Sequence, residues 1–183
     1  IIEYCRQGIS NYEKYKEGTK PVPHGEIMKW LDKLNPDRLS REPNPGSDGK
    51  SYPSPKENWY ASRAKALLGL RRYEECVEVC TQALSQFQQL HYDYDVWFRN
   101  NRAESYLALG KGADALPDIE YMMAHKPDPW IRHRYALALR AVGRIDEAIP
   151  YAAEAALPHQ RLGFRWEVYL DLGEMLEQMG EGE

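Results

Sequence analysis

The chain has 183 residues, of which 43% are apolar and 28% are charged, and 24 basic and 28 acidic side chains give it a net charge of −4. This composition predicts a packed core in one domain or one compact array with an appendage, and it excludes wholesale disorder. The acidic net charge also argues against a strongly basic surface that binds nucleic acid. A membrane span is not expected, because no apolar run is long enough. Three cysteines indicate a reducing compartment. We therefore expect a cytoplasmic protein with no membrane association.

The first 53 residues predict a helical appendage (1–34) followed by a linker (35–53). One helix is expected over residues 1–17, and a shorter one over residues 26–34, where Ile27, Trp30, Leu31 and Leu34 recur at helical spacing. Residues 35–53 are rich in proline and glycine, which remove backbone donors and disfavour helix. We predict an irregular connection there, leading to a repeat array over residues 54–183.

A strong helix start opens this third region. Ser54 offers a capping hydroxyl, Pro55 suits the first turn, and Glu57 stands three residues after the cap. The sequence therefore predicts a helix that begins just after Ser54.

Small side chains then recur in register along two sets of predicted helices. They are Ala64, Ala103 and Ala136 in the first helices, and Cys76, Ala115 and Ala148 in the second helices. Two helices can approach to about 8–10 Å only where side chains are small. Pro117 and Pro150 fall at one repeat position, near the predicted first turn of the second helices. The pattern predicts helix–turn–helix units with a period of about 34 residues.

This pattern resembles the tetratricopeptide repeat (TPR) family over residues 54–180. Tyr60, Ala83 and Pro127 match consensus positions, whereas Arg63 and Arg102 stand where leucine is usual. The resemblance implies an all-α, TPR-like helix–turn–helix solenoid of about three full repeats, with a final unpaired or capping helix and the N-terminal helical appendage.

The last predicted helix matches the first-helix pattern through Tyr169, Leu172, Gly173 and Leu176. Its partner helix would begin near Glu181, so we expect a fragment of a larger bacterial protein. The alternative is a solvating cap helix with an exposed acidic face, formed by Glu167, Asp171, Glu174 and Glu177. An uncovered last helix would also allow a homodimer.

The cysteines and acidic residues suggest no chemistry. Cys76 and Cys80 share a helix face, but both fall on small core positions, so packing is the expected role. Asp114 and Asp118 are interpreted as helix-start residues that interact with the helix dipole. No phosphate loop, nucleophile elbow or zinc motif is present in the sequence. We predict no enzymatic activity, no metal and no cofactor.

The TPR resemblance implies a partner-binding groove along the first helices. Mixed aromatic, amide and cationic side chains suit an extended peptide or a carboxylate. The alternative for Trp97 and Trp130 is packing against neighbouring units. Only Asn101 and Arg134 match the five residues with which some members of the family clamp a chaperone's C-terminal carboxylate, so such a clamp is not expected. The predicted groove residues are Lys65, Trp97, Asn100, Asn101, Glu104, Trp130, His133, Arg134, Leu137 and Arg140.

Four short strings, at residues 34–36, 54–57, 73–76 and 91–93, carry a second resemblance. They are similar to a bacterial group of TPR proteins with a C-terminal cold-shock-like domain, some of which belong to predicted genome-conflict systems. This resemblance implies an alternative function as an accessory module of a nucleic-acid-associated protein. Nucleic acid would then be bound by a part of the native protein that follows this chain. Our main prediction is a scaffold that binds a protein or peptide partner.

Overall fold

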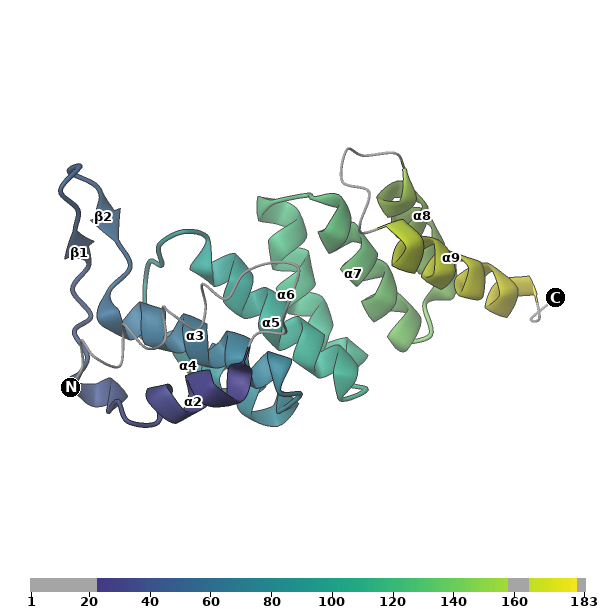
Figure 1. The fold of residues 1–183 in the computed structure, drawn as a ribbon. Coiled ribbons are helices and arrows are strands. Elements are labelled where there is room, and N and C mark those ends of the chain that lie inside the picture. The colour runs from purple at the N-terminus through teal and green to yellow at the C-terminus, as the bar shows by residue number, and fades with distance from the viewer. Residues whose placement is uncertain (1–22, 158–164, 181–183) are drawn as a thin grey trace. The chain divides into compact units, whose positions relative to one another are not determined.

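The computed structural model describes residues 23–157 and 165–180. The helix expected over residues 1–17 and the lone Cys5 lie outside the described residues. Within them the chain folds into helices joined by short turns, as predicted, and the helices are α2 (His24–Leu31), α3 (Pro55–Gly69), α4 (Tyr73–Gln86), α5 (Tyr94–Ala108), α6 (Gly112–His125), α7 (Pro129–Ala141), α8 (Ile145–Ala156) and α9 (Arg165–Gly180) (Figure 1).

The chain divides into two compact units, Ile1–Asn101 and Arg102–Glu183, with α5 contributing to both. The predicted all-α class of helix–turn–helix repeats is confirmed, with α3 and α4, α5 and α6, and α7 and α8 as the three pairs and α9 as the final first helix.

Helix α3 begins with the predicted capping box. The Ser54 hydroxyl accepts a hydrogen bond from the Glu57 backbone N–H at 3.1 Å, and the Glu57 carboxylate accepts one from the Ser54 N–H at 2.6 Å. Pro55 occupies the first turn, where its missing donor is not needed. The local sequence therefore fixes the start of the first repeat.

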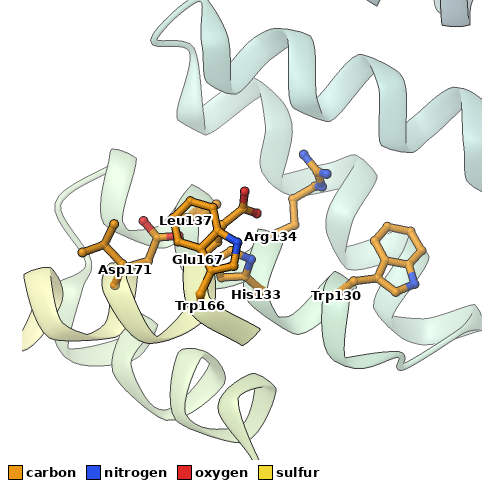
Figure 2. A pocket seen from close by; sticks show the side chains of 8 residues that line it. Trp130, His133, Arg134, Leu137, Trp166, Glu167 and Asp171 are labelled. Atoms are coloured by element: carbon orange, nitrogen blue, oxygen red, sulfur yellow. The ribbon is translucent and has the colours of Figure 1, made fainter. Parts of the chain in front are cut away.

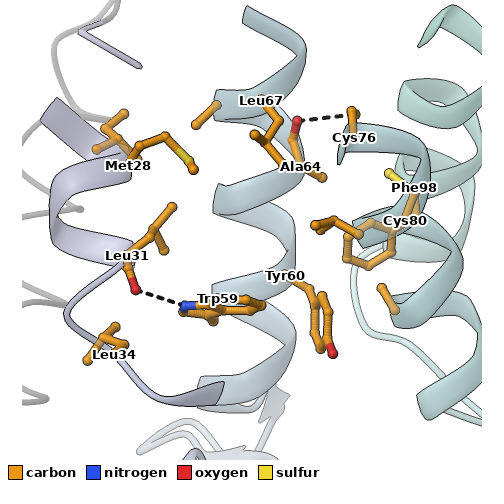
Figure 3. Packing of buried hydrophobic residues seen from close by; sticks show 14 of the residues in the cluster. Met28, Leu31, Leu34, Trp59, Tyr60, Ala64, Leu67, Cys76, Cys80 and Phe98 are labelled. Atoms are coloured by element: carbon orange, nitrogen blue, oxygen red, sulfur yellow. Dashed lines mark hydrogen bonds between the residues drawn. The ribbon is translucent and has the colours of Figure 1, made fainter. Parts of the chain in front are cut away.

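The core of the first unit is built on both sides of α3 (Figure 3). Leu31 of α2 and Leu67 of α3 are fully buried, and the Trp59 indole N–H donates to the Leu31 carbonyl at 3.3 Å. On the other side, Cys76 and Cys80 of α4 are fully buried and carry free thiols. Their predicted role in packing is confirmed.

The segment between α2 and α3 is more ordered than an irregular linker. A 3₁₀ turn (Pro36–Arg38) leads to a two-stranded antiparallel ribbon, in which β1 (Asn44–Pro45) pairs with β2 (Ser51–Tyr52). Gly49 has a φ of 76°, which suits the turn, and the Tyr52 hydroxyl donates to Asp48 at 3.0 Å. Proline and glycine here shape a hairpin, because the turn needs a positive φ and a short edge strand tolerates a missing donor.

The alanines that define the repeat are completely buried. Ala64, Ala103 and Ala136 in the first helices and Ala115 and Ala148 in the second helices have no exposed surface. In the second unit, Ala136 and Leu139 of α7 pack with Ala148 and Ala152 of α8 and with Met175 of α9. The predicted register of the repeat is thereby confirmed.

Two arginines replace the usual leucine, and each meets an acidic partner. The Arg63 Nη1 lies 2.7 Å from the Asp32 carboxylate. Arg102 forms a bidentate salt bridge with Asp118, in which its Nε and Nη2 each donate to one carboxylate oxygen at 2.7 Å. Asp118 is the seventh residue of α6 and is buried, so its interpretation as a helix-start residue is wrong. A buried carboxylate needs a paired cation, and Arg102 supplies one.

Pro117 and Pro150 share a repeat position, but it lies one turn deeper than expected. Each is the sixth residue of its helix, in α6 and α8 respectively. A proline there removes one intrahelical hydrogen bond and favours a local bend.

None of the helices in the described parts of the chain combines the length and the apolarity that a membrane crossing requires.

Candidate functional site

The second unit contains a pocket of about 330 Å³ between α7 and α9 (Figure 2). Four of the predicted groove residues line it from α7, and four residues of α9 line it from the other side. The α7 residues are Trp130, His133, Arg134 and Leu137, and the α9 residues are Trp166, Glu167, Leu170 and Asp171.

The repeat itself explains why these residues of α9 face α7. Val168 and Met175 are fully buried in the core of the unit, which fixes the rotation of the helix. At 3.6 residues per turn, Glu167, Leu170 and Asp171 then fall at the repeat positions that Trp130, His133 and Arg134 occupy in α7. The two sides of the pocket are therefore equivalent faces of two first helices.

Ion pairs tie the two helices together beside the pocket. The His133 Nε2 lies 2.7 Å from Asp171 Oδ2, and since a carboxylate can only accept, Nε2 carries the hydrogen. Arg140 donates to Glu174 at 2.9 Å and lies 3.9 Å from Asp171. Asp171 and Glu174 thus belong to an inter-helix network, and the interpretation of all four α9 acids as a purely solvating face is wrong for these two.

Arg134 contributes a cationic side chain to the pocket lining. Its Nη2 lies 3.1 Å from a carboxylate oxygen of Glu104. Its Nε is buried, and none of the described residues accepts a hydrogen bond from it. Because this Nε has almost no accessible surface, a ligand in the pocket would meet the outer part of the guanidinium, since the Arg134 side chain is 23% exposed.

Apart from Glu167, the remaining lining residues of the pocket are apolar. Trp166 and Leu170 are more than half exposed, whereas Trp130 and Leu137 are half-buried. The Trp130 indole N–H donates to Asp128 at 3.3 Å, which holds the ring at the start of α7. Aromatic and aliphatic walls around a few polar groups suit the binding of a side chain together with its adjoining backbone.

The other predicted groove residues lie in the first unit, except for Glu104 and Arg140. Lys65 and Trp97 are exposed, Asn101 is half-buried and Asn100 is buried. The Asn100 amide nitrogen lies 3.5 Å from Asn101 Oδ1, and the Asn100 Oδ1 is buried with no donor among the described residues. The role of this group in partner binding stays a prediction.

Sequence reasoning missed the α9 half of the pocket. The signal was present, because Leu172, Gly173 and Leu176 had placed α9 in the first-helix register. Carrying the groove positions onto a fourth helix would have identified Glu167, Leu170 and Asp171. Trp166 lies one residue before that set and follows from no repeat position.

A second polar cluster, in the first unit, was also not predicted. The Glu57 carboxylate accepts hydrogen bonds from the His91 backbone N–H at 3.1 Å and from the His91 Nδ1 at 2.9 Å. The His91 Nε2 lies 3.0 Å from the Ser51 hydroxyl. Burial alone would raise the pKa of Glu57, but hydrogen bonds from His91 and Ser54 outweigh it and lower the pKa. The network joins β2, the start of α3 and the loop before α5, which is a structural role.

Residues 23–157 and 165–180 bring together no group of three or more His, Cys, Asp or Glu side chains that could hold a metal ion.

No family model and no curated protein sequence matches the chain. Solved structures do match it. MamA (MSR-1) is 19% identical with a TM-score of 0.65, over 98% of this chain and 87% of that chain. A Podosopora anserina protein of the kinesin light chain type, with nearly identical TPR-like repeats, is 16% identical with a TM-score of 0.63, over 98% and 85%. Bacillus thuringiensis PlcR, solved with the peptide PapR7 and DNA, is 14% identical with a TM-score of 0.62, over 98% and 61%. These likenesses confirm the predicted TPR-like fold.

Proposed function

We propose that this protein is a non-enzymatic interaction scaffold, and that the α7–α9 pocket holds an extended segment of a protein partner. The observation that carries the proposal is the pocket itself, in which two equivalent helix faces place apolar side chains beside the guanidinium of Arg134. The fold supports it, since PlcR, a protein with a similar fold, was solved in complex with a peptide.

The lining indicates what kind of segment fits. An apolar side chain would pack between Trp166 and Leu137, while a backbone carbonyl or a carboxylate would accept from the guanidinium of Arg134, which is 23% exposed. Glu167 offers a carboxylate for a backbone N–H or a cationic side chain. We therefore expect short sequences with one large apolar residue next to a carboxylate or a free carbonyl.

A random peptide library selected on the purified chain tests this proposal. Selected peptides are titrated by calorimetry against the wild type and against Trp130→Ala and Arg134→Gln. Each variant should weaken binding by about tenfold or more, the effect of losing roughly 1.4 kcal/mol of contact energy. Circular dichroism verifies that both variants remain folded.

Tyr92→Ala is the matched control, because Tyr92 is an exposed aromatic of the first unit that does not line the pocket. Equal binding by the wild type and both pocket variants would contradict the proposal. Selection of no peptide above background would do the same.

The structure adds no support to the nucleic-acid alternative. The cations nearest the pocket already face carboxylates, Arg134 that of Glu104 and Arg140 that of Glu174. A nucleic-acid module should lose affinity steeply with added salt, so a titration with single-stranded DNA at two salt concentrations separates the two functions.

A further inference from the structure

The first unit contains a pocket of its own, of about 370 Å³, which is bounded by α3, α4 and the end of α2. We call it the α2–α4 pocket. Its floor is made of buried apolar side chains, namely Leu31, Leu34, Trp59 and Val79. Its rim carries exposed polar side chains, namely Asp32, Glu75, Glu78 and Gln82. It shares no described lining residue with the α7–α9 pocket, so it is a separate candidate site.

The other two repeats fill the equivalent space with a pair of large side chains. In the second repeat, Arg102 of α5 forms its bidentate salt bridge with Asp118 of α6. In the third repeat, the rings of Tyr135 of α7 and Tyr151 of α8 meet edge to face, with their centroids 4.8 Å apart. Arg102 and Tyr135 directly precede the small first-helix residue of their repeat, and Asp118 and Tyr151 come three residues after the small second-helix residue. The repeat therefore brings one side chain from each helix together at this position.

The first repeat leaves the same position open. The corresponding residues are Arg63, directly before Ala64, and Val79, three residues after Cys76. Val79 is short and apolar and offers Arg63 no partner, so Arg63 pairs with Asp32, just after α2, at 2.7 Å. The α2–α4 pocket is thus the space of a side-chain pair that the first repeat does not supply.

The rim makes this pocket acidic. Among its described lining residues, three carboxylates face one cation, Arg63, which Asp32 already neutralises. Glu75 is paired with Arg72 at 2.6 Å. Glu78 accepts a hydrogen bond from the Gln82 amide at 3.2 Å, and no cation of the described residues pairs with it. The pocket therefore presents a carboxylate without a counter-charge beside an apolar floor.

We infer that the α2–α4 pocket binds a cationic side chain, a lysine or an arginine, from a basic segment of a protein partner. The aliphatic stem of such a side chain would cover Leu34 and Val79, and its charged head would donate to the Glu78 carboxylate. An acidic segment is disfavoured by the three carboxylates of the lining. The segment expected here therefore differs in charge from the one proposed for the α7–α9 pocket.

Nuclear magnetic resonance titration of the whole ¹⁵N-labelled chain tests this inference, which does not rest on the proposed function. The probe is a capped alanine–arginine–alanine tripeptide, and the Trp59 indole N–H and the backbone N–H groups of Glu78 and Val79 should shift. The same peptide with citrulline, which has nearly the shape of arginine but no charge, should bind about threefold more weakly or worse. Added salt should weaken the arginine peptide, because the head group is partly exposed to solvent.

Glu78→Gln should weaken the arginine peptide by about threefold to fivefold, since it removes the exposed charge that faces the head group. Glu74→Gln is the matched control, because Glu74 is an exposed acid of the same helix that does not line the pocket. Both variants change exposed side chains and should keep the wild-type melting temperature. Val79→Tyr should abolish the shifts, because it places in the pocket the side chain that the third repeat holds there.

Equal binding of the arginine and citrulline peptides would overturn the inference, as would wild-type affinity in Glu78→Gln. Shifts confined to residues outside the pocket would have the same meaning. Peptides selected on the α7–α9 pocket should bind Glu78→Gln as they bind the wild type, because Glu78 does not line that pocket. A failure of this inference is therefore distinguishable from a failure of the proposed function.

Discussion

Helices α3 and α9 hold the same place in a helix–turn–helix unit, but their surroundings differ. In the first unit, α3 is covered on one side by α2, through Leu31 and Trp59, and on the other side by α4. In the second unit, α9 packs on α8 and reaches α7 through ion pairs, while Tyr169, Leu170 and Leu176 stay exposed. The comparison teaches that a repeat sequence specifies which faces of a helix can dock, whereas the neighbours decide whether such a face becomes core or surface.

Truncating one leucine in each region should give the largest contrast. Leu31→Ala removes a fully buried side chain beneath α3 and should lower the free energy of unfolding by about 2–5 kcal/mol. Leu176→Ala, at an exposed position of α9, should change it by less than about 0.5 kcal/mol. Urea unfolding followed by circular dichroism measures both free energies. Similar losses in the two variants would show that Leu176 is buried in solution.

Enlarging the small residue at one shared repeat position should give the next largest contrast. Ala64→Leu overpacks a site with no exposed surface and should destabilise the protein by about 1–3 kcal/mol. Gly173→Leu at the equivalent position of α9 should not destabilise the monomer, because space is open there. Thermal melts of the two variants compare them directly. A tolerated Ala64→Leu would mean that the alignment of the repeats is shifted.

The Glu57–His91 network of the first unit should respond to pH. Glu57→Gln removes the charge that accepts from His91 and Ser54, and it should cost about 1–2 kcal/mol at pH 7. The folded pKa of Glu57 lies below its usual value of 4.5, so its carboxylate stabilises the fold above that pH.

That contribution is lost as the pH falls through the folded pKa of Glu57. The stability difference between the wild type and Glu57→Gln should therefore shrink on acidification, as measured by urea unfolding at a series of pH values. A difference that is constant from neutral to acidic pH would show that the lost hydrogen-bond geometry, and not the charge, accounts for the effect.

The smallest effect is expected where the two regions are alike. Each has an exposed arginine–glutamate pair at the start of a second helix, Arg72 with Glu75 and Arg144 with Glu147, both at 2.6 Å. The hydrogen bonds from arginine lower the pKa of each glutamate, but exposed pairs are screened by water and salt. Glu75→Gln and Glu147→Gln should both leave the melting temperature nearly unchanged at 0.15 M salt. A clear loss in only one of them would reveal a regional difference that the geometry does not show.

The sequence predicted the parts of the fold that local patterns encode. The capping box at Ser54 involves residues three apart, and the buried alanines follow a helical period, so both could be predicted without coordinates. The same register placed Trp130, His133, Arg134 and Leu137 on one face, and all four line the pocket.

The remaining features depend on contacts between residues far apart in the chain. Glu57 and His91 are 34 residues apart, and His133 and Asp171 are 38 apart. The helical spacing of three and four residues does not pair such positions, because the pairing is set by how helices pack and how loops close. Asp118 was misinterpreted for this reason, since its partner Arg102 lies on another helix.

Trp166 and Leu170 line the α7–α9 pocket although both are more than half exposed. A captured segment would therefore cover apolar surface that otherwise faces water. Binding should then carry a negative change in heat capacity, which calorimetry at a series of temperatures measures.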